Sequence, residues 1–334
     1  MEVDRQRAVE VATDAFHAHG ITEADAVRTA EVLVSADARG KRSHGLLRLP
    51  RFVRGIEHGN VDPDGTISVE SERGGAVALD GGSRLGPVVA STAAAEAMDR
   101  ADDYGVGAVG VHDSNHLGML GYYTDQLQRE GYVGIAMTNT EPAMPPYGGA
   151  EPVLGTNPIA IGLPTDPVFN LDMSTSAIAR GTVLHEKETG GELPEGVALD
   201  ADGQPTTDPA AALEGTILPF GGTKGSGLAI AVEVVAGGLV GASMGEDVTG
   251  TYHTEDPCTK GDLFLAIDPD ALGVPDFAER ASRFLTSLTS GDPAAHVDEI
   301  RLPGQRSVAR DRSATTVEVE DELWADVRAL AAGD

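Results

Sequence analysis

The feature that most constrains the fold of this chain is the order in which two hydrophobic periodicities follow one another. Apolar residues recur at helical spacing in the first part, where helices are predicted from about residues 8, 22 and 46 onward. Short strand-like apolar runs then alternate with helical stretches, at 76–79, 109–111, 133–137, 159–163 and 169–173. Helical patterns return at 228–240, 277–288 and 321–330. This order predicts an α/β (α+β) fold, in which an α/β domain is inserted in a discontinuous helical domain.

The domain boundaries are predicted from the positions where the periodicity changes. We expect the first part of the helical domain at 1–72, the α/β domain at 73–222, and a mainly helical remainder at 223–334 that completes the first domain. A strand near 262–268 is predicted to return to the sheet. Residues 191–209 are rich in Gly, Pro, Asp and Glu, which is typical of an exposed excursion.

The charge balance excludes several kinds of partner. The chain has 53 Asp and Glu against 24 Lys and Arg, a net charge of -29, and only four lysines: Lys41, Lys187, Lys224 and Lys260. Such self-repulsion is relieved by molar salt, so we interpret the chain as a halophile's protein. The charge is spread along the sequence, whereas an acidic nucleic-acid mimic or cation buffer would gather it in a tail. Binding to nucleic acid or to an anionic membrane is disfavoured.

The cysteine content and the absence of targeting patterns bear on compartment and chemistry. The charged N-terminus is followed by no apolar stretch suited to secretion, and no segment reaches the length that spans a bilayer. We therefore expect a cytoplasmic protein. A single cysteine, Cys258, excludes an internal disulfide and a thiolate zinc site, so redox chemistry would need a bound cofactor.

Two glycine-rich stretches have different meanings. Gly105 to Gly110 matches the dinucleotide pattern G-x-G-x-x-G, but a helix is predicted before it and a strand after it, the reverse of the Rossmann arrangement. Gly221 to Gly227 lacks the order of a Walker A motif. Its glycines nevertheless lead into a predicted helix, whose N-terminus attracts anions, and Lys224 adds a positive charge there. The competing interpretation of Lys224 is a solvated turn lysine.

Histidines near positions 44 and 112–116 are candidates for proton transfer. His112 and His116 have the spacing of a metal-binding pair, but the intervening residues indicate a loop that enters a helix and lack the glutamate of an H-E-x-x-H motif. His116, in a Ser-Asn-His loop, is well placed for acid–base chemistry or is a plain loop histidine. His44 and Arg48 start a predicted helix on one face, where the guanidinium can hold a carboxylate beside the imidazole. Taken alone, exposed His and Arg pairs on helices are common.

Taken together, these segments resemble the type-2 malate/L-lactate dehydrogenase family, which also includes ureidoglycolate, sulfolactate and diketogulonate oxidoreductases and a cyclic-imine reductase. The resemblance covers nearly the whole chain and is strongest from 43 to 240. The matching stretches follow in order: Ser43-His44-Gly45 with Arg48, Ser114-Asn115-His116-Leu117-Gly118, Thr138-Asn139-Thr140, Tyr147-Gly148-Gly149, Leu154-Gly155-Thr156-Asn157-Pro158, Leu171-Asp172-Met173-Ser174-Thr175-Ser176, Lys224-Gly225-Ser226-Gly227-Leu228, Phe264-Leu265-Ala266-Ile267-Asp268-Pro269 and Arg301-Leu302-Pro303-Gly304.

The resemblance implies a non-Rossmann NAD(P)-binding α/β domain and a homodimer with its active site near the subunit interface. It implies that the nicotinamide cofactor, NAD with NADP as an alternative, is lined by Thr140, Asp172, Met173, Ser174, Thr175, Ser176, Lys224, Pro303, Gly304 and Gln305. His44, Arg48 and His116 would surround the substrate. The family often has Pro-Gly-Glu where this chain has Gln305, and Gly-His-Phe-Phe where it has Asp262 and Leu263. The first difference leaves NAD against NADP open, because a carboxylate there would repel a 2'-phosphate.

We therefore expect hydride transfer between NAD(P) and C2 of a small 2-hydroxy or 2-oxo acid such as malate or lactate, without a metal. Arg48 would hold the carboxylate, and one of His44 and His116 would carry the hydroxyl proton. His116 is favoured slightly, since Ser114 and Asn115 could fix its tautomer, and Glu141 is a possible partner for a histidine. Alternatives are a ureidoglycolate, sulfolactate or cyclic-imine oxidoreductase and, in another class, a metal-dependent hydrolase that uses His112 and His116.

Overall fold

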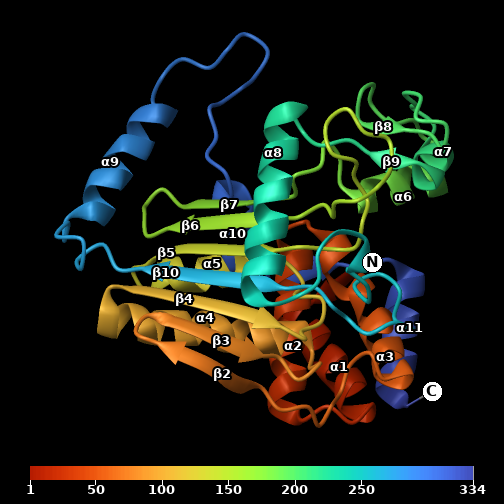
Figure 1. Cartoon of the computed structure of the whole chain (residues 1–334), viewed down its shortest axis with the longest axis horizontal. Coiled ribbons are helices and arrows are strands. Elements are labelled where there is room, and N and C mark those ends of the chain that lie inside the picture. The colour runs from red at the N-terminus through yellow and green to blue at the C-terminus, as the bar shows by residue number, and fades with distance from the viewer. Residues whose placement is uncertain (334) are drawn as a thin grey trace.

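A seven-stranded mixed sheet forms the centre of the computed structural model, which describes residues 1–333 (Figure 1). In sheet order, its strands are β2 (Ser68–Arg73), β3 (Ala76–Asp80), β4 (Val106–His112), β10 (Asp262–Ile267), β5 (Val133–Thr138), β6 (Ile159–Leu163) and β7 (Phe169–Met173). The pair β3–β4 is parallel, and every other neighbouring pair is antiparallel. β10, late in the chain, therefore lies between two strands from the middle of it.

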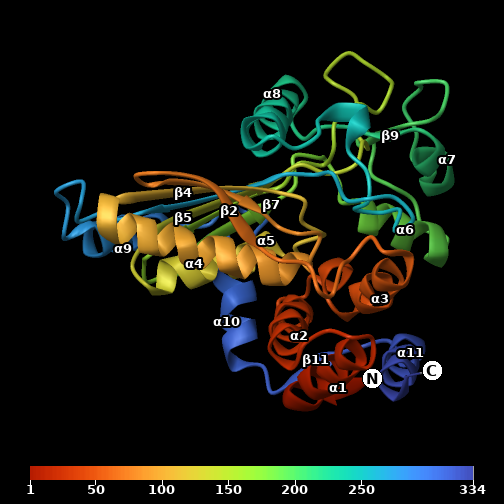
Figure 2. The same ribbon diagram turned by 60° about the horizontal axis from the view of Figure 1, so that its bottom comes forward.

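Helices cover both faces of this sheet (Figure 2). On one face, α4 (Gly86–Tyr104) and α5 (Leu120–Arg129) pack through alanine, valine and leucine side chains onto the strands. On the other lies an apolar helical stretch made of α8 (Thr223–Val232), a π-helical turn (Glu233–Gly237) and a 3-10 turn (Gly238–Val240). One face of the sheet is thus fully buried, whereas the other is only partly covered: alternate residues of β4, β5 and β6 are half-buried, and β2 is exposed throughout.

The G-x-G-x-x-G pattern is part of this packing. α4 ends at Tyr104 before it and β4 begins at Val106 within it, so the predicted helix-then-strand order is confirmed. A Cβ atom on Gly107 would lie 1.9 Å from the Ala97 carbonyl oxygen of α4. This glycine therefore permits close helix–sheet contact.

The helical unit brings the two ends of the chain together. It contains α1 (Arg5–Ala18), α2 (Glu23–Ala38), α3 (Leu49–His58) and α11 (Asp321–Ala332), which share one apolar core, with α10 (Gln305–Ser313) beside α2. β1 (Glu2–Asp4) pairs with β11 (Thr316–Glu318). Thr22 caps α2 by accepting a hydrogen bond from the Asp25 N–H.

Residues 180–217 form a small lobe with its own core, where the composition predicts only an exposed excursion at 191–209. The lobe contains α6 (Arg180–Thr189), β8 (Ala198–Leu199), α7 (Pro209–Glu214) and β9 (Thr216–Ile217). Five apolar side chains are buried inside it: Val183, Leu193, Ala198, Ala212 and Ile217. These apolar residues are too widely spaced to stand out against the surrounding Gly and Pro.

The predicted division at 223–334 also needs correction. The stretch Thr223–Val240 packs on β4, β5 and β10, so it belongs with the sheet. β10 returns to the sheet, as predicted for residues 262–268. α9 (Phe277–Thr289) stands at the end of the sheet far from the termini (Figure 1). Only α10 and α11 rejoin the helical unit. An apolar helix can cover either a sheet or other helices, and periodicity alone does not distinguish the two.

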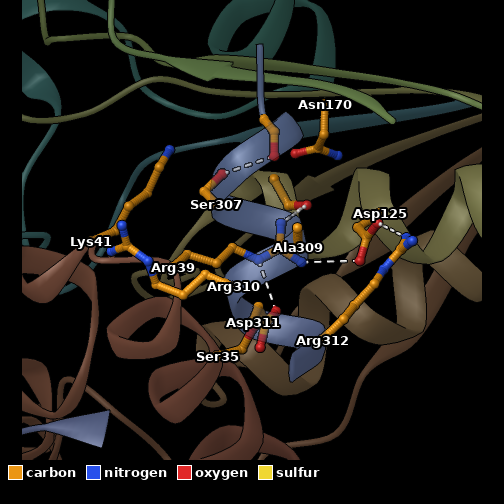
Figure 3. A network of polar contacts seen from close by, with 12 residues as sticks. Ser35, Arg39, Lys41, Asp125, Asn170, Ser307, Ala309, Arg310, Asp311 and Arg312 are labelled. Atoms are coloured by element: carbon orange, nitrogen blue, oxygen red, sulfur yellow. Dashed lines mark hydrogen bonds and ion pairs between the residues drawn. The ribbon is translucent and has the colours of Figure 1, made fainter. Parts of the chain in front are cut away.

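A buried ionic network joins the helical unit to the sheet domain (Figure 3). Arg39, at the end of α2, donates hydrogen bonds to the carboxylates of Asp311 in α10 (2.9 Å) and Asp125 in α5 (3.0 Å). Ser35 donates to Asp311 at 2.6 Å. The Arg39 and Asp125 side chains are only 3% and 2% exposed. The network therefore fixes three helices directly beneath the turn that follows Arg39.

Candidate active site

A cavity of about 420 Å³ opens where the helical unit, the sheet and the small lobe meet. The residues around it come from seven parts of the chain: the turn between α2 and α3, the loop after β4, the end of β5, the loop before β6, the end of β7, the start of α6, and the loop before β10. Those that carry polar or ionisable groups are Lys41, Ser43, His44, Arg48, His116, Thr138, Thr140, Glu141, Thr156, Asp172, Ser174, Ser176, Arg180, Thr251, Tyr252 and Lys260.

The turn that carries His44 and Arg48 consists of two 3-10 turns, Arg42–His44 and Leu46–Arg48, and α3 begins only at Leu49. The Asp37 carboxylate accepts a hydrogen bond from the Leu46 N–H at 2.8 Å. Arg48 Nε donates to the Ser43 carbonyl oxygen at 2.7 Å. Burial raises the pKa of Asp37 to about 7. The sequence places His44 and Arg48 on one helical face; in the structure, local backbone contacts bring them together instead.

His44 and His116 face one another in the cavity, with ring centroids 5.8 Å apart. The Gly118 N–H donates to His116 Nδ1 at 3.0 Å, so neutral His116 carries its proton on Nε2. His44 Nδ1 lies 2.9 Å from the Ser43 hydroxyl, which can donate or accept. The two rings therefore differ in the protonation states that their neighbours permit.

Both imidazoles are held neutral. Burial, with help from the nearby Arg48 charge, lowers the pKa of His44 to about 4. The same two causes lower the pKa of His116 well below its usual value. A neutral imidazole at physiological pH is able to accept a proton from a hydroxyl group.

The residues that the sequence suggested as partners of His44 and His116 contact other groups in the structure. Ser114 donates to the Asp262 carboxylate at 2.6 Å, and Asn115 donates to the carbonyl oxygens of residues 60, 83 and 84. Both side chains hold the loop, whereas the His116 tautomer is set by Gly118. Glu141 does contact a histidine, but it is His253, with Nδ1 at 2.9 Å.

Five of the expected cofactor residues line the main cavity directly. They are Thr140, Asp172, Met173, Ser174 and Ser176. Thr175 is buried behind the wall, where its hydroxyl donates to the Thr156 carbonyl oxygen at 2.9 Å. The hydroxyl groups of Ser174 and Ser176 are 2.8 Å apart. This wall offers hydroxyl and backbone groups of the kind that bind an amide or ribose, so its composition fits a nicotinamide nucleoside.

A buried glutamate orders the strand ends that carry Thr140. Glu233, in the π-helical turn after α8, accepts hydrogen bonds from Asn139 (2.9 Å) and Asn157 (2.6 Å). Asn157 in turn accepts from the Thr140 N–H at 3.3 Å. The Thr-Asn-Thr and Gly-Thr-Asn-Pro motifs therefore meet at one carboxylate.

The helical stretch that contains Glu233 is also notable for its length and its apolar composition. Sequence analysis predicts no segment long enough to span a bilayer, but within residues 1–333 Thr223–Val240 does have the length and apolar composition of a membrane-crossing helix. Its central carboxylate is bonded to two strand loops of the same chain. The stretch is thus a structural part of the site.

The remaining expected cofactor residues lie outside the main cavity. Lys224 is exposed in the first turn of α8. Pro303 and Gly304 line a neighbouring hollow of about 180 Å³, which shares Lys41, Met119 and Asp172 with the main cavity. Gln305 accepts a hydrogen bond from the Leu302 N–H at 3.3 Å. Gly304 packs against β7, where a Cβ atom would lie 2.3 Å from the Asn170 carbonyl oxygen.

Sequence analysis assigned no role to several charged residues at this site. Lys41 donates to the Asp172 carboxylate at 2.5 Å, and the buried Lys260 donates to Asp262 at 2.6 Å and to Ser114 at 2.9 Å. Arg180 and Tyr252 also line the cavity. The scarcity of lysine was a usable signal, because two of the four lysines lie here.

The pair needed for a metal-dependent hydrolase does not come together. His112 does not line the cavity; its ring nitrogens lie 2.8 Å from a Glu70 oxygen and 3.0 Å from an Asp113 oxygen. Asp80, His112 and Asp113 are close enough to share an ion, but His116 is not among them. The geometry therefore does not support that alternative.

Comparison with known proteins agrees with the site. The sequence pattern of the malate/L-lactate dehydrogenase family matches residues 3–328. The chain belongs to this family. It is 41% identical to L-sulfolactate dehydrogenase of Methanothermobacter thermautotrophicus, over 99% of this chain and 96% of that protein. It is also 41% identical to malate/(S)-sulfolactate dehydrogenase of Methanothermus fervidus, over 95% and 93%. The family predicted from the motifs is thus confirmed.

Solved structures confirm the fold class. Sulfolactate dehydrogenase from Methanocaldococcus jannaschii superposes with a TM-score of 0.94 at 38% identity, covering 99% of this chain and 97% of that one. A (2R)-3-sulfolactate dehydrogenase (NADP(+)) of Chromohalobacter salexigens is 35% identical over 98% of this chain and 98% of that protein. A ureidoglycolate dehydrogenase (NAD(+)) of Escherichia coli is 30% identical over 97% of this chain and 94% of that protein. The chain is an NAD(P)-dependent dehydrogenase.

Proposed function

We propose that this dehydrogenase transfers a hydride between NAD(P) and C2 of a small 2-hydroxy or 2-oxo acid such as malate or lactate. The observation that carries the proposal is that His44, His116 and Arg48 meet in one cavity with Thr140, Asp172 and Ser174. A bound nicotinamide cofactor accepts or supplies the hydride. Arg48 binds the substrate carboxylate, and a histidine exchanges the hydroxyl proton.

Arg48 is suited to carboxylate binding because it has no carboxylate of its own. Among residues 1–333 it forms no ion pair; its one side-chain hydrogen bond is to the Ser43 carbonyl oxygen. Burial lowers the pKa of Arg48 to about 10, so it stays charged at neutral pH. A bidentate carboxylate would compensate this partly desolvated charge.

We assign the proton transfer to His44 and the orientation of the substrate oxygen to His116. Protonation of His116 Nδ1 would break its bond from the Gly118 N–H, whereas Nε2–H is free to donate to the substrate oxygen. The Ser43 hydroxyl accommodates His44 in either neutral tautomer and also as an imidazolium. This assignment reverses the sequence-based preference for His116, which rested on Ser114 and Asn115.

The alternative substrates use the same machinery. Sulfolactate and ureidoglycolate share the hydroxyl and carboxylate of lactate, and relatives that act on them are named above. A further relative, 35% identical over 87% of this chain, is a pyrroline- and piperideine-2-carboxylate reductase, for which a C=N bond takes the place of the C=O bond. Discrimination among them depends on the protein groups that surround the substituent on C2.

We also propose that the enzyme is a homodimer with its active site near the subunit interface. The helical stretch Thr223–Val240 exposes Ile230, Val234 and Leu239, and Leu239 is 70% exposed. Large apolar side chains grouped on one helix are typical of an interface. Analytical ultracentrifugation tests this: a dimer that becomes monomeric in Leu239→Glu supports it, and a monomeric wild type contradicts it.

The proposed setting is the cytoplasm of a halophile. The net charge of -29 leads us to expect that folding and activity need high KCl or NaCl, which screens the mutual repulsion of acidic groups. The test is a melting curve and an activity assay across salt concentration. Full activity and an unchanged Tm in dilute buffer would refute it.

The proposed reaction is tested by an assay of the purified protein at high salt. Malate, lactate, sulfolactate and ureidoglycolate, with the corresponding oxo acids, are offered with NAD and with NADP, and cofactor absorbance is followed. Turnover of at least one acid that is lost in Arg48→Ala supports the proposal. Absence of turnover with all of them, under conditions where the protein is folded, contradicts it.

A further inference from the structure

Two arginines and one tyrosine form a cluster at the side of the cavity. The guanidinium carbon of Arg51 lies 4.2 Å from the centroid of the Tyr252 ring, and that of Arg180 lies 4.6 Å from it. Arg51 comes from α3, and Arg180 is the first residue of α6 in the small lobe. Elements far apart in the sequence therefore place two cations on one aromatic ring.

This arginine–tyrosine cluster adjoins the substrate residues. Tyr252 and Arg180 line the main cavity together with His44, Arg48 and His116. Arg51 lines a small adjoining hollow, whose walls also include Arg48 and His116. The Arg51 charge helps to lower the pKa of Arg48, which places the two guanidinium groups within electrostatic reach.

The cluster holds positive charge that no acidic side chain compensates. Arg48, Arg51 and Arg180 form no ion pair with an acidic group in residues 1–333, although the chain has 53 acidic residues against 24 basic ones. The cavity lysines differ, since Lys41 pairs with Asp172 and Lys260 with Asp262. One carboxylate on Arg48 would neutralise only one of the three guanidinium charges. Like charges kept together in this way favour a ligand with more than one negative charge.

The loop that carries Tyr252 is held in place. The Glu141 carboxylate accepts hydrogen bonds from the N–H groups of Tyr252 (2.6 Å) and His253 (3.3 Å). The ring is thereby a fixed support for both guanidinium groups, which are planar and match the oxygens of a carboxylate or sulfonate. Glu141 thus acts as a positioning residue for this loop, in addition to its contact with the His253 ring.

We propose that Arg51 and Arg180, supported by Tyr252, bind a second anionic group on C3 of the substrate, a carboxylate or a sulfonate, so that the enzyme selects dianionic 2-hydroxy acids over lactate. This inference rests on the proposed function, in which Arg48 binds the C1 carboxylate. It assigns the discrimination to two residues that lie outside the motifs of the family resemblance.

The test compares the reduction of oxaloacetate, which has the second carboxylate, with that of pyruvate, which lacks it, at one fixed salt concentration. Wild type, Arg180→Gln and Arg51→Gln are measured, with Arg180→Lys as a variant that keeps the charge but loses the planar fork. Arg54→Gln is the matched control, because Arg54 lies on α3, is exposed and lines neither cavity. Cofactor Kd is measured for each protein by fluorescence titration.

We expect kcat/KM for oxaloacetate to fall about 10- to 100-fold in Arg180→Gln and Arg51→Gln, the effect of losing one charge-assisted hydrogen bond. Pyruvate reduction and cofactor Kd should change less than about threefold, and Arg180→Lys should lie between wild type and Arg180→Gln. Equal losses for both acids, or weaker cofactor binding, would assign the arginines to the cofactor and overturn the inference. If wild type reduces neither acid, calorimetric binding of malate against lactate decides the inference separately from the proposed function.

Discussion

His44 and His116 lie side by side at the cavity, with ring centroids 5.8 Å apart and ring planes inclined at 38°, and their Nδ1 atoms have different neighbours. A backbone N–H donates to His116, whereas a hydroxyl that can rotate faces His44. A site that must gain and lose a proton in each turnover needs one ring that tolerates both charge states. The difference in neighbours therefore separates the two roles.

Replacement of each histidine by asparagine should distinguish these roles. We expect His44→Asn to lose on the order of 10² to 10⁴ in kcat, the usual contribution of a positioned acid–base group. His116→Asn should chiefly raise KM, since an amide can still donate to the substrate oxygen. Steady-state kinetics with cofactor affinity measured separately is the readout. The opposite pattern would return the proton transfer to His116, and near-normal kcat in both variants would move it to water or another group.

The lowered pKa of His44 also predicts a pH effect on stability. Because the unfolded histidine takes up its proton near pH 6.5 and the folded one only near 4, His44 contributes stability above 6.5 that is lost as the pH falls towards 4. The full effect is up to about 3 kcal/mol, and His116 acts in the same direction.

Asp37 opposes this effect, because its raised pKa costs stability as the pH rises from about 4 through 7. Because the two effects oppose each other in the wild type, the test compares the pH dependence of stability in variants that each lack one of the two groups. When the pH is lowered from 7.5 to 5, the free energy of unfolding measured with urea should fall less in His44→Asn than in wild type. It should fall more in Asp37→Asn than in wild type. An identical pH dependence in all three proteins would mean that neither group titrates differently on folding.

The buried Arg39 network should dominate the attachment of the helical unit to the sheet domain. Arg39→Met leaves the carboxylates of Asp125 and Asp311 without their central partner, which should cost about 3–5 kcal/mol, the usual size for a broken buried ion pair. The control is Arg42→Gln, which removes the exposed ion pair with Glu318 and should cost less than about 1 kcal/mol. Chemical unfolding at equal salt measures both, and equal losses would contradict a structural role for the network.

Lys224 gives a test of the expected cofactor residues that lie outside the main cavity. Its place in the first turn of α8, after Gly222, leads us to expect weaker cofactor binding in Lys224→Ala with little change in substrate KM. Lys187→Ala is the control, because Lys187 is an exposed lysine of α6. Fluorescence titration with NAD and NADP gives the affinities. Unchanged cofactor Kd would make Lys224 a solvated turn residue.

Local motifs, and the family resemblance that they carry, were sufficient to predict the family, the strand runs and several residues that face the cavity, because each depends on short stretches of sequence. His44, Arg48, His116, Thr140 and Asp172 were found in this way. The pairings were not predictable: which lysine lines the cavity, which group orients His116 and which histidine meets Glu141 all depend on segments far apart in the chain. The position of Thr223–Val240 against the sheet, and the core of the small lobe, are likewise products of tertiary packing.

The central claim, hydride transfer between substrate C2 and the nicotinamide ring, is tested most directly with malate that carries deuterium at C2. The enzyme is incubated with this substrate and oxidised NAD or NADP at high salt, and the reduced cofactor is analysed by mass spectrometry. We predict one deuterium in each reduced cofactor molecule formed, with none released to water, for malate or for whichever C2-labelled hydroxy acid is turned over fastest. Deuterium found in the solvent, or product formed without reduction of the cofactor, would contradict the account.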